Sequence, residues 1–309
     1  MLNPNLFNGP WAGLPLSWTD QNNLDLDVYF SDVERCAHAD VPGIYTGGTT
    51  GEFYALELDE YQQVVQTTIA AARPQKTPVM IGVTSTYTLG AQRRAAYAAE
   101  AGADAIQIAL PFWLPVDEPQ ILPFFIAVSK ACGHLPLSIY ETTRCKVTLT
   151  LEQHREIHET LPNYQMVKAN AGTIGATQEG CRQLAQIVNV FVAESKWREL
   201  YPCGASGSCS AIVYWNPRVL LRYWQSLNDQ NLVICNHLAD KFDALSNFLD
   251  QHFAPRGFTD TAYDRLGAVT SGFLKTSLTN RGPYVAPTVA DITALQNWYR
   301  EHFPEMLEL

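Results

Sequence analysis

Lys168 is the residue whose position most directly suggests chemistry. It stands in the run Tyr164–Asn170, where apolar residues lie on both sides of it. A short apolar run of this kind is typical of a buried parallel strand. Burial removes water from an ammonium group and favours the neutral amine, which is the nucleophile that Schiff-base formation requires. The run alone also permits a lysine that only caps or pairs at a strand end.

Two further stretches carry groups that fit a lysine nucleophile. The apolar run Leu135–Tyr140 ends in a phenol, which could shuttle a proton or simply pack at a rim. The turn Gly47–Glu52 combines glycines with two threonine hydroxyls, so its N–H and O–H groups could bind a carboxylate or phosphate. A plain glycine-rich turn is the alternative. The turn lacks the lysine of a Walker loop, which argues against nucleotide binding.

The elements that must position these groups alternate along the chain. Amphipathic stretches, expected to be helices, separate short apolar runs over the first two thirds of the sequence. The expected strands are Trp11–Trp18, Val41–Thr46, Pro78–Thr84, Ala105–Leu110, Leu135–Tyr140, Tyr164–Lys168, Val188–Ala193 and Ser208–Val213. Four helical stretches follow, at Val219–Leu227, Leu232–Phe253, Ala262–Lys275 and Val289–Phe303.

Eight strand–helix alternations predict an α/β fold, a TIM (β/α)8 barrel followed by a C-terminal helical extension. We expect residues 1–228 to form the barrel with the active site and residues 229–309 to form the helical region. A doubly wound sheet usually has nearer six strands, and no G-x-G-x-x-G follows the first strand. In a barrel, the carboxyl ends of the strands meet at one face, which is where active sites form.

Composition excludes several classes of function. The 309 residues carry a net charge of −10 and no basic run, which argues against nucleic acid or a membrane surface as a partner. The seven scattered cysteines contain no C-x-x-C pair, so we expect reduced thiols in a cytoplasmic protein. The N-terminal residues show no secretory signal, and no apolar run reaches membrane-spanning length.

Three motifs stand in order along the chain. They are Gly48-Thr49-Thr50-Gly51-Glu52, then Ile139-Tyr140, then Val167-Lys168, with 28 positions between Tyr140 and Lys168. They resemble, respectively, the G-[TS]-T-G-E signature, the start of the Tyr-Asn motif and the Schiff-base segment of the dihydrodipicolinate synthase / N-acetylneuraminate lyase superfamily. The resemblance covers nearly the whole chain.

The resemblance implies a role for each motif. Lys168 would form an imine with the keto carbon of pyruvate or a longer 2-oxo acid. Thr49 and Thr50, with backbone N–H groups around Gly48, would bind its carboxylate. Tyr140 would be the general acid/base beside the imine. The covalent imine on Lys168 would replace any metal or other cofactor.

The sequence also departs from the family. Glu141 follows Tyr140 where the family usually has asparagine, and its role is open. Arg144 could hold the carboxylate of a second substrate, or it could be a solvent-exposed loop arginine. Strand four ends in Pro111-Phe112-Trp113 without the phenol of the lysine-pathway synthases. Trp113 could therefore form an aromatic wall, or could pack between subunits.

Several other polar positions are also candidates for a functional role. Glu194 could bind substrate hydroxyls or could be a rim carboxylate paired with Lys196, and Ser210 matches a hydroxyl position near the imine in lyase members. His154 and His158 are spaced as on a zinc helix, but no glutamate directly follows the first histidine. We therefore expect solvated histidines and no metal site. Arg281-Gly282-Pro283-Tyr284 is expected to be a turn before the last helix rather than a substrate loop.

Together these features predict a class I, metal-independent enzyme that acts on pyruvate or a longer 2-oxo acid through Lys168. An aldolase or lyase is favoured. The alternatives are a 2-keto-3-deoxy sugar-acid dehydratase, a dihydrodipicolinate synthase-like condensation, and a non-enzymatic keto-acid sensor. The resemblance implies a homotetramer built as paired dimers, with a homodimer as the simpler form. The sequence does not name the aldehyde or sugar acid.

Overall fold

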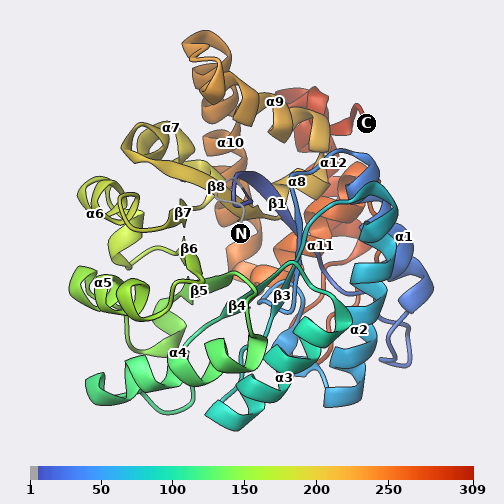
Figure 1. Ribbon diagram of the computed structural model, residues 1–309. Helices are drawn as coiled ribbons and strands as arrows, with labels where there is room; N and C mark the ends of the chain where they lie inside the picture. The colour runs from blue at the N-terminus through green and yellow to red at the C-terminus, as the bar shows by residue number, and fades with distance from the viewer. Residues whose placement is uncertain (1–5) are drawn as a thin grey trace. The chain divides into compact units, whose positions relative to one another are not determined.

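A computed structural model describes residues 6–309 and places the strands in a closed barrel, in the order β1-β2-β3-β4-β5-β6-β7-β8. Figure 1 shows these strands with helices following them along the chain. Within the described residues, the strands are β1 (Gly9–Gly13), β2 (Ile44–Thr46), β3 (Val79–Gly82), β4 (Ala105–Ile108), β5 (Leu137–Glu141), β6 (Tyr164–Ala169), β7 (Asn189–Phe191) and β8 (Ala205–Ser210). The predicted TIM barrel is confirmed.

Several helices begin where the sequence supplies acceptors for backbone N–H groups that lack a partner within the helix. Capping boxes open α2, α4, α5 and α12, at Glu57, Asp117, Thr150 and Thr288. The helices are α1 (Leu26–His38), α2 (Leu58–Ala72), α3 (Thr88–Ala101), α4 (Glu118–Cys132), α5 (Leu151–Thr160), α6 (Gln178–Leu184), α7 (Trp197–Leu200), α8 (Ile212–Trp215), α9 (Pro217–Asn228), α10 (Leu232–Phe253), α11 (Asp260–Ser271) and α12 (Val289–His302). The predicted C-terminal helices are present as α9–α12.

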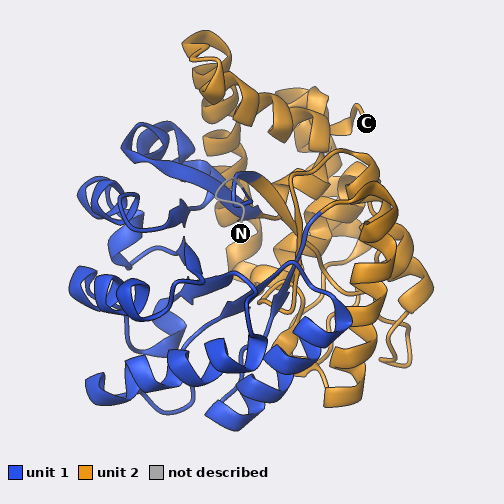
Figure 2. Cartoon of the chain, viewed as in Figure 1, with its two compact units in different colours: residues 1–9, 78–209 blue, residues 10–77, 210–309 orange. Residues whose placement is uncertain are grey.

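The chain divides into two compact units, which Figure 2 colours separately. Unit 1 holds residues 1–9 and 78–209, and therefore contains β3–β7, α3–α7 and β8 as far as Cys209. Unit 2 holds residues 10–77 and 210–309, so the C-terminal helices belong to the same unit as β2, α1 and α2. The division expected between residues 228 and 229 stays a prediction.

The pairing of β5 with β6 sets up the central geometry of unit 1. The two strands run parallel, and a register shift between Leu137 and Ser138 brings Tyr140 opposite Lys168. Such an irregularity inserts one residue into a strand and turns the side chains beyond it. Since paired residues on neighbouring strands share a face, the phenol and the amine emerge on the same side of the sheet.

Two of the expected strands were wrongly placed. The first strand ends at Gly13 instead of Trp18, and the eighth is Ala205–Ser210 instead of Ser208–Val213. The true eighth strand reads ASGSCS and lacks the β-branched and aromatic residues that mark strands in a sequence. Its small side chains are required by packing, because a Cβ atom at Gly207 would overlap the Gly9 carbonyl oxygen and the Phe191 ring.

The cysteines and the helices give two further facts. All seven cysteines are free thiols. Within residues 6–309, no helix combines the length and the apolar character needed to cross a membrane.

Candidate active site

Lys168 and Tyr140 lie together at the carboxyl ends of β6 and β5. The Lys168 Nζ atom is 4.2 Å from the centroid of the Tyr140 ring. Lys168 is half-buried, whereas Tyr140 is buried. An amine in contact with a phenol at the carboxyl ends of barrel strands is the arrangement needed for imine chemistry with a neighbouring acid/base.

Asn170 joins this pair, and the sequence reasoning missed it. Its Nδ2 atom donates a hydrogen bond to the Tyr140 phenolic oxygen at 3.3 Å. Its backbone N–H donates to the Glu141 carbonyl, also at 3.3 Å. Asn170 was visible in the sequence as the residue two places after Lys168. Its contact with Tyr140, however, depends on the register of β5 against β6.

Cys209 and Glu194 contribute to the electrostatics of this end of unit 1. Burial raises the pKa of the Cys209 thiol, the positive charge of Lys168 lowers it, and the negative charge of Glu194 raises it. Glu194 is 9% exposed, and Lys196 forms an ion pair with Glu199 at 3.1 Å. The role of Glu194 stays a prediction.

A layer of polar and sulfur-containing side chains lies one step back along the strands from Lys168 and Tyr140. The Gln107 amide donates to the Ser138 hydroxyl at 3.0 Å, and that hydroxyl contacts the Met166 sulfur at 3.2 Å. Ser138 and Met166 precede Tyr140 and Lys168 by two residues, so they share the same face of their strands. All three side chains of this layer are 0–1% exposed, so Lys168 and Tyr140 lie next to a buried polar layer.

The turn Gly47–Glu52 belongs to unit 2. Gly47 has φ 74°, and Glu52 has φ 45°, in the left-handed region that non-glycine residues rarely occupy. Gly48 has no space for a side chain, because a Cβ atom would overlap the Tyr45 ring. Thr49 and Thr50 are half-buried. The local backbone is thus the tight, strained turn that its three glycines suggested.

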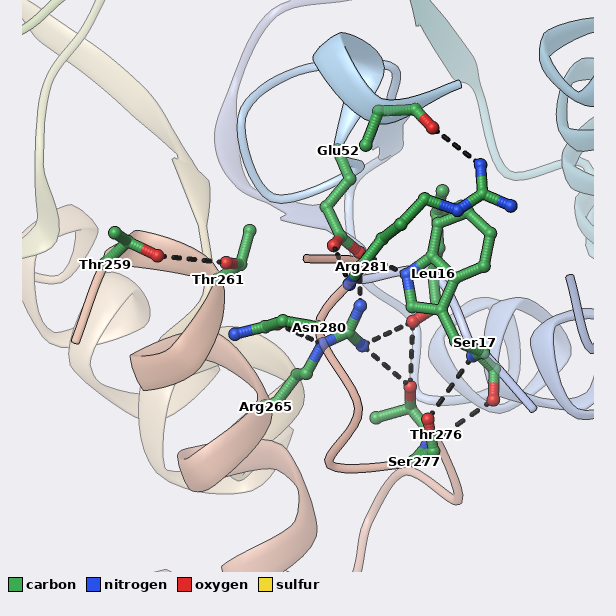
Figure 3. A network of polar contacts seen from close by, with 12 residues as sticks. Leu16, Ser17, Glu52, Thr259, Thr261, Arg265, Thr276, Ser277, Asn280 and Arg281 are labelled. Atoms are coloured by element: carbon green, nitrogen blue, oxygen red, sulfur yellow. Dashed lines mark hydrogen bonds and ion pairs between the residues drawn. The ribbon is translucent and has the colours of Figure 1, made fainter. Parts of the chain in front are cut away.

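Glu52 connects this turn to a buried polar network, and Figure 3 shows its carboxylate beside Arg265. Its side chain is fully buried, accepts a hydrogen bond from Trp18 Nε1 at 2.8 Å and forms an ion pair with Arg265. Arg265, on α11, is also fully buried and donates to Leu16 and Asn280. An ion pair whose two side chains are both buried needs such additional hydrogen bonds to offset the loss of hydration.

Arg281 is part of the same network and follows Asn280 in the predicted turn before α12. Its guanidinium binds both oxygens of the Glu60 carboxylate, at 2.6 and 2.7 Å, and lies 4.0 Å from the Trp18 ring centroid. These hydrogen bonds raise the pKa of Arg281 and lower the pKa of Glu60. Arg281 therefore holds its segment against the start of α2.

The loop between β5 and α5 places Arg144 and approaches Trp113. Arg144 is exposed, and its backbone N–H donates to the Thr142 hydroxyl at 3.3 Å. The Lys146 ammonium donates to the Trp113 carbonyl at 2.6 Å, and the Trp113 side chain is 74% exposed. The Cys145 thiol donates to the Leu110 carbonyl at 3.1 Å. The loop is thus tied to the end of β4, with the Trp113 ring facing outward.

Ser210 ends β8 in unit 2 and is fully buried. Its hydroxyl oxygen accepts a hydrogen bond from the Val213 N–H at 3.0 Å, at the start of α8. This contact gives the residue a local capping function. Its predicted place near the imine stays a prediction.

The expectation of solvated histidines was wrong for His154. Its side chain is fully buried, with Nε2 3.2 Å from Glu141 Oε2 and Nδ1 2.7 Å from the Tyr164 hydroxyl. His158, one turn later, is half-buried and its Nδ1 contacts the Tyr164 carbonyl at 3.2 Å. The helix pattern could not reveal this burial, because the polar partners come from β5 and β6. Among the described residues, no cluster of histidine, cysteine, aspartate or glutamate is arranged to hold a metal ion.

The fold and the site geometry define a TIM barrel with a lysine and a tyrosine paired at neighbouring strand ends. The profile of the dihydrodipicolinate synthetase family matches residues 7–279. The chain therefore belongs to this family.

Individual relatives match a shorter part. The 4-hydroxy-tetrahydrodipicolinate synthase of Rhizobium meliloti is 29% identical over 175 residues, which cover 56% of this chain and 59% of that protein. The N-acetylneuraminate lyase of an Enterobacter species is 28% identical over 168 residues, 54% of this chain and 56% of that protein. The chain thus matches less than two thirds of the length of these curated relatives.

Solved structures extend the likeness in fold to almost the full chain. One is YagE, a prophage protein of the dihydrodipicolinic acid synthase family from E. coli K12, in complex with pyruvate. It has a TM-score of 0.85 at 18% identity and covers 96% of this chain and 98% of that chain. At this level of identity, the likeness establishes the fold alone.

Proposed function

We propose that the protein is a class I, metal-independent aldolase or lyase that acts on pyruvate or a longer 2-oxo acid through an imine on Lys168. The observation that carries the proposal is the 4.2 Å approach of the Lys168 amine to the Tyr140 ring. Membership of the dihydrodipicolinate synthetase family supports it. Further support comes from a relative named as a lyase and from the pyruvate bound in YagE.

In the cleavage direction, the Lys168 amine attacks the keto carbon, and the carbonyl oxygen leaves as water. The protonated imine then accepts the electron pair of the C3–C4 bond while the C4 hydroxyl gives up its proton, and the aldehyde leaves. Protonation of the enamine at C3 and addition of water release pyruvate and the free amine. Tyr140 acts as the general acid/base in these proton transfers, and condensation is the reverse sequence.

The remaining predicted site residues are assigned to recognition of the substrate. The Gly48–Thr50 turn binds the carboxylate of the 2-oxo acid with its hydroxyl and backbone N–H groups. Glu194, Arg144, Ser210 and Trp113 recognise the rest of the substrate. The covalent imine on Lys168 serves in place of a cofactor.

Borohydride trapping with pyruvate tests this proposal. We expect intact-mass analysis to find one reduced pyruvate adduct on the wild-type protein and on Lys196→Ala, in which an exposed lysine is removed. The adduct should be lost in Lys168→Ala. A wild-type protein without an adduct, or an adduct that survives Lys168→Ala, would refute the assignment. A turnover screen of 2-keto-3-deoxy acids and of aldehyde–pyruvate pairs then identifies the reaction.

We also infer a homotetramer in the cytoplasm. The family resemblance supports the assembly, as does the exposed apolar side chain of Leu114 after β4. The seven free thiols support a reducing compartment. Sedimentation equilibrium tests the assembly and cell fractionation tests the location. A monomer, or a protein found in a secreted fraction, would contradict the respective inference.

A further inference from the structure

A buried chain of three polar side chains lies on unit 1, on the helix side of β5 and β6. The Tyr164 hydroxyl is 2.7 Å from His154 Nδ1, and His154 Nε2 is 3.2 Å from Glu141 Oε2. Tyr164 and His154 are 0% exposed, and Glu141 is 4% exposed. A carboxylate withdrawn from water to this degree is costly unless each of its oxygens has a partner. None of these three side chains has a role in the proposed reaction.

The hydrogen bonds of this chain have one consistent direction when Glu141 is ionised and His154 is neutral. A carboxylate only accepts, so His154 donates from Nε2, and its Nδ1 then accepts the proton of the Tyr164 hydroxyl. Burial and the negative charge of Glu141 raise the pKa of Tyr164 well above its usual value, which keeps that hydroxyl a donor. The second carboxylate oxygen, Oε1, accepts from the Leu149 backbone N–H at 2.7 Å. Both oxygens of Glu141 are therefore used.

These bonds fix two parts of the backbone relative to each other. Glu141 is the last residue of β5, while Leu149 ends the loop that carries Arg144, just before α5. His154 links the same carboxylate to α5 itself. A cavity of only about 10 Å³ remains among Tyr140, Glu141, Cys145 and Leu149, so the loop packs closely against the strand end.

Tyr140 precedes Glu141, so its side chain lies on the opposite face of β5. On that face, Asn170 donates to the phenol, while its backbone N–H donates to the Glu141 carbonyl. The two residues at the end of β5 are therefore held from both sides of the strand. We propose that Glu141 and His154 are positioning residues that fix the Tyr140 phenol beside the Lys168 amine. This inference rests on the proposed function of that pair.

A double-mutant cycle with Tyr140→Phe tests the inference. Glu141→Ala and His154→Phe each remove the bond between strand and helix, and misplacement of a reacting group costs on the order of 10- to 100-fold in rate. We expect such a loss in single-turnover rates measured with enzyme in excess, while the yield of borohydride-trapped imine stays near wild type. In the Tyr140→Phe background, the same substitutions should change the rate less than about twofold, because the group they position is absent.

Two variants restore the contacts, and one serves as a matched control. The amide of Glu141→Gln can still accept a hydrogen bond from the Leu149 N–H. It can also donate to His154 Nε2, provided that the imidazole proton moves to Nδ1. The amide of His154→Gln can still donate to the Glu141 carboxylate. Both should retain most of the wild-type rate. His158→Phe changes the same helix one turn away, where the histidine contacts Tyr164 but has no bond to Glu141 in the structure. It should leave the rate unchanged.

The outcomes separate this inference from the proposed function. Rate losses that are equally large with and without the Tyr140 phenol would show that Glu141 and His154 have a merely structural role, and would overturn the inference. A wild-type rate in folded Glu141→Ala would overturn it as well. If Glu141→Ala does not fold, Glu141→Asp replaces it in the cycle, because its shorter side chain cannot reach both partners. Failure of the wild-type protein to form an imine would instead refute the assignment of Lys168.

Discussion

At the scale of single residues, the candidate site depends on contacts that join adjacent strands. Lys168 contacts Tyr140, and Asn170 contacts both the Tyr140 phenol and the Glu141 backbone. The asparagine amide donates to the phenolic oxygen, and a donor there stabilises that oxygen whenever it carries negative charge. We therefore group Asn170 with Tyr140, the proposed acid/base residue, rather than with the packing of β6.

Substitution of Asn170 should lower turnover without preventing imine formation. Asn170→Asp keeps the shape of the side chain but replaces the donor with a negative acceptor. We expect a loss of at least about 10-fold in kcat, which corresponds to one charge-linked hydrogen bond of roughly 1.5 kcal/mol. Asn170→Ala should lose somewhat less. Steady-state kinetics measure the effect, with borohydride trapping as the control. A full wild-type kcat in Asn170→Asp would show that the contact has no catalytic role.

At the scale of elements, the Gly47–Glu52 turn and α11 form one structural piece of unit 2. Glu52 has a strained backbone, and its Oε2 atom accepts a hydrogen bond from Trp18 Nε1 and forms an ion pair with Arg265 from α11. The C-terminal helical region is therefore required to shape the turn that we assign to the substrate carboxylate. A barrel truncated before α11 would leave Glu52 without its ion-pair partner.

Removal of Arg265 should be strongly destabilising. Arg265→Met leaves a buried carboxylate without its ion-pair partner, which costs about 3–5 kcal/mol in the free energy of unfolding. The double variant Glu52→Gln/Arg265→Met should lose less than the single variant, because no unpaired charge remains. Urea unfolding measures both. As a control, Arg182→Met removes an exposed ion pair with Glu179 and should cost no more than about 1 kcal/mol. A double variant less stable than Arg265→Met would contradict this account.

At the scale of the whole molecule, distant segments of unit 2 are joined through α1. Asp32 is 1% exposed, and its Oδ1 atom accepts from the Lys275 N–H at 2.7 Å, across 243 positions of sequence. Burial raises the pKa of Asp32 to about 6, although the N–H groups of Lys275 and Thr276 and nearby positive charges lower it in part. The folded protein therefore binds this proton more tightly than the unfolded chain does.

This pKa predicts a defined pH dependence of stability. Burial raises the pKa of Asp32 in the folded protein from 3.8 to about 6. The free energy of unfolding therefore falls as the pH rises through that window, because the folded protein holds the charged carboxylate less favourably than the unfolded chain does. This loss of stability is absent at a pH below the unfolded-state pKa of Asp32. It is complete above the folded-state pKa, where it amounts to roughly 2–3 kcal/mol. Stability of Asp32→Asn relative to wild type should thus improve by about that amount between roughly pH 4 and pH 7. Urea unfolding at several pH values measures this difference, and a constant difference would refute the assignment.

The sequence supported the local features of the site better than the long-range ones. A few neighbouring residues were enough to predict each of three features: the strand around Lys168, the phenol of Tyr140 and the glycine-rich turn. His154 was misread because its burial depends on a carboxylate that β5 supplies. Arg265 was not recognised because its partner Glu52 lies 213 positions away. The eighth strand was misplaced because its residues, ASGSCS, have low strand propensity. Close packing, rather than strand propensity, requires small side chains there.

Cys209 offers a chemical handle on the site. It is the one cysteine of the seven that is partly exposed, and the charges of Lys168 and Glu194 both act on its thiol. A small alkylating reagent should therefore label Cys209 ahead of the six buried thiols, and faster in alkaline solution, since burial raises its pKa. We expect pyruvate to slow this labelling, which peptide mass mapping can follow over time. Labelling spread evenly over several cysteines would show that burial does not control thiol reactivity in this protein.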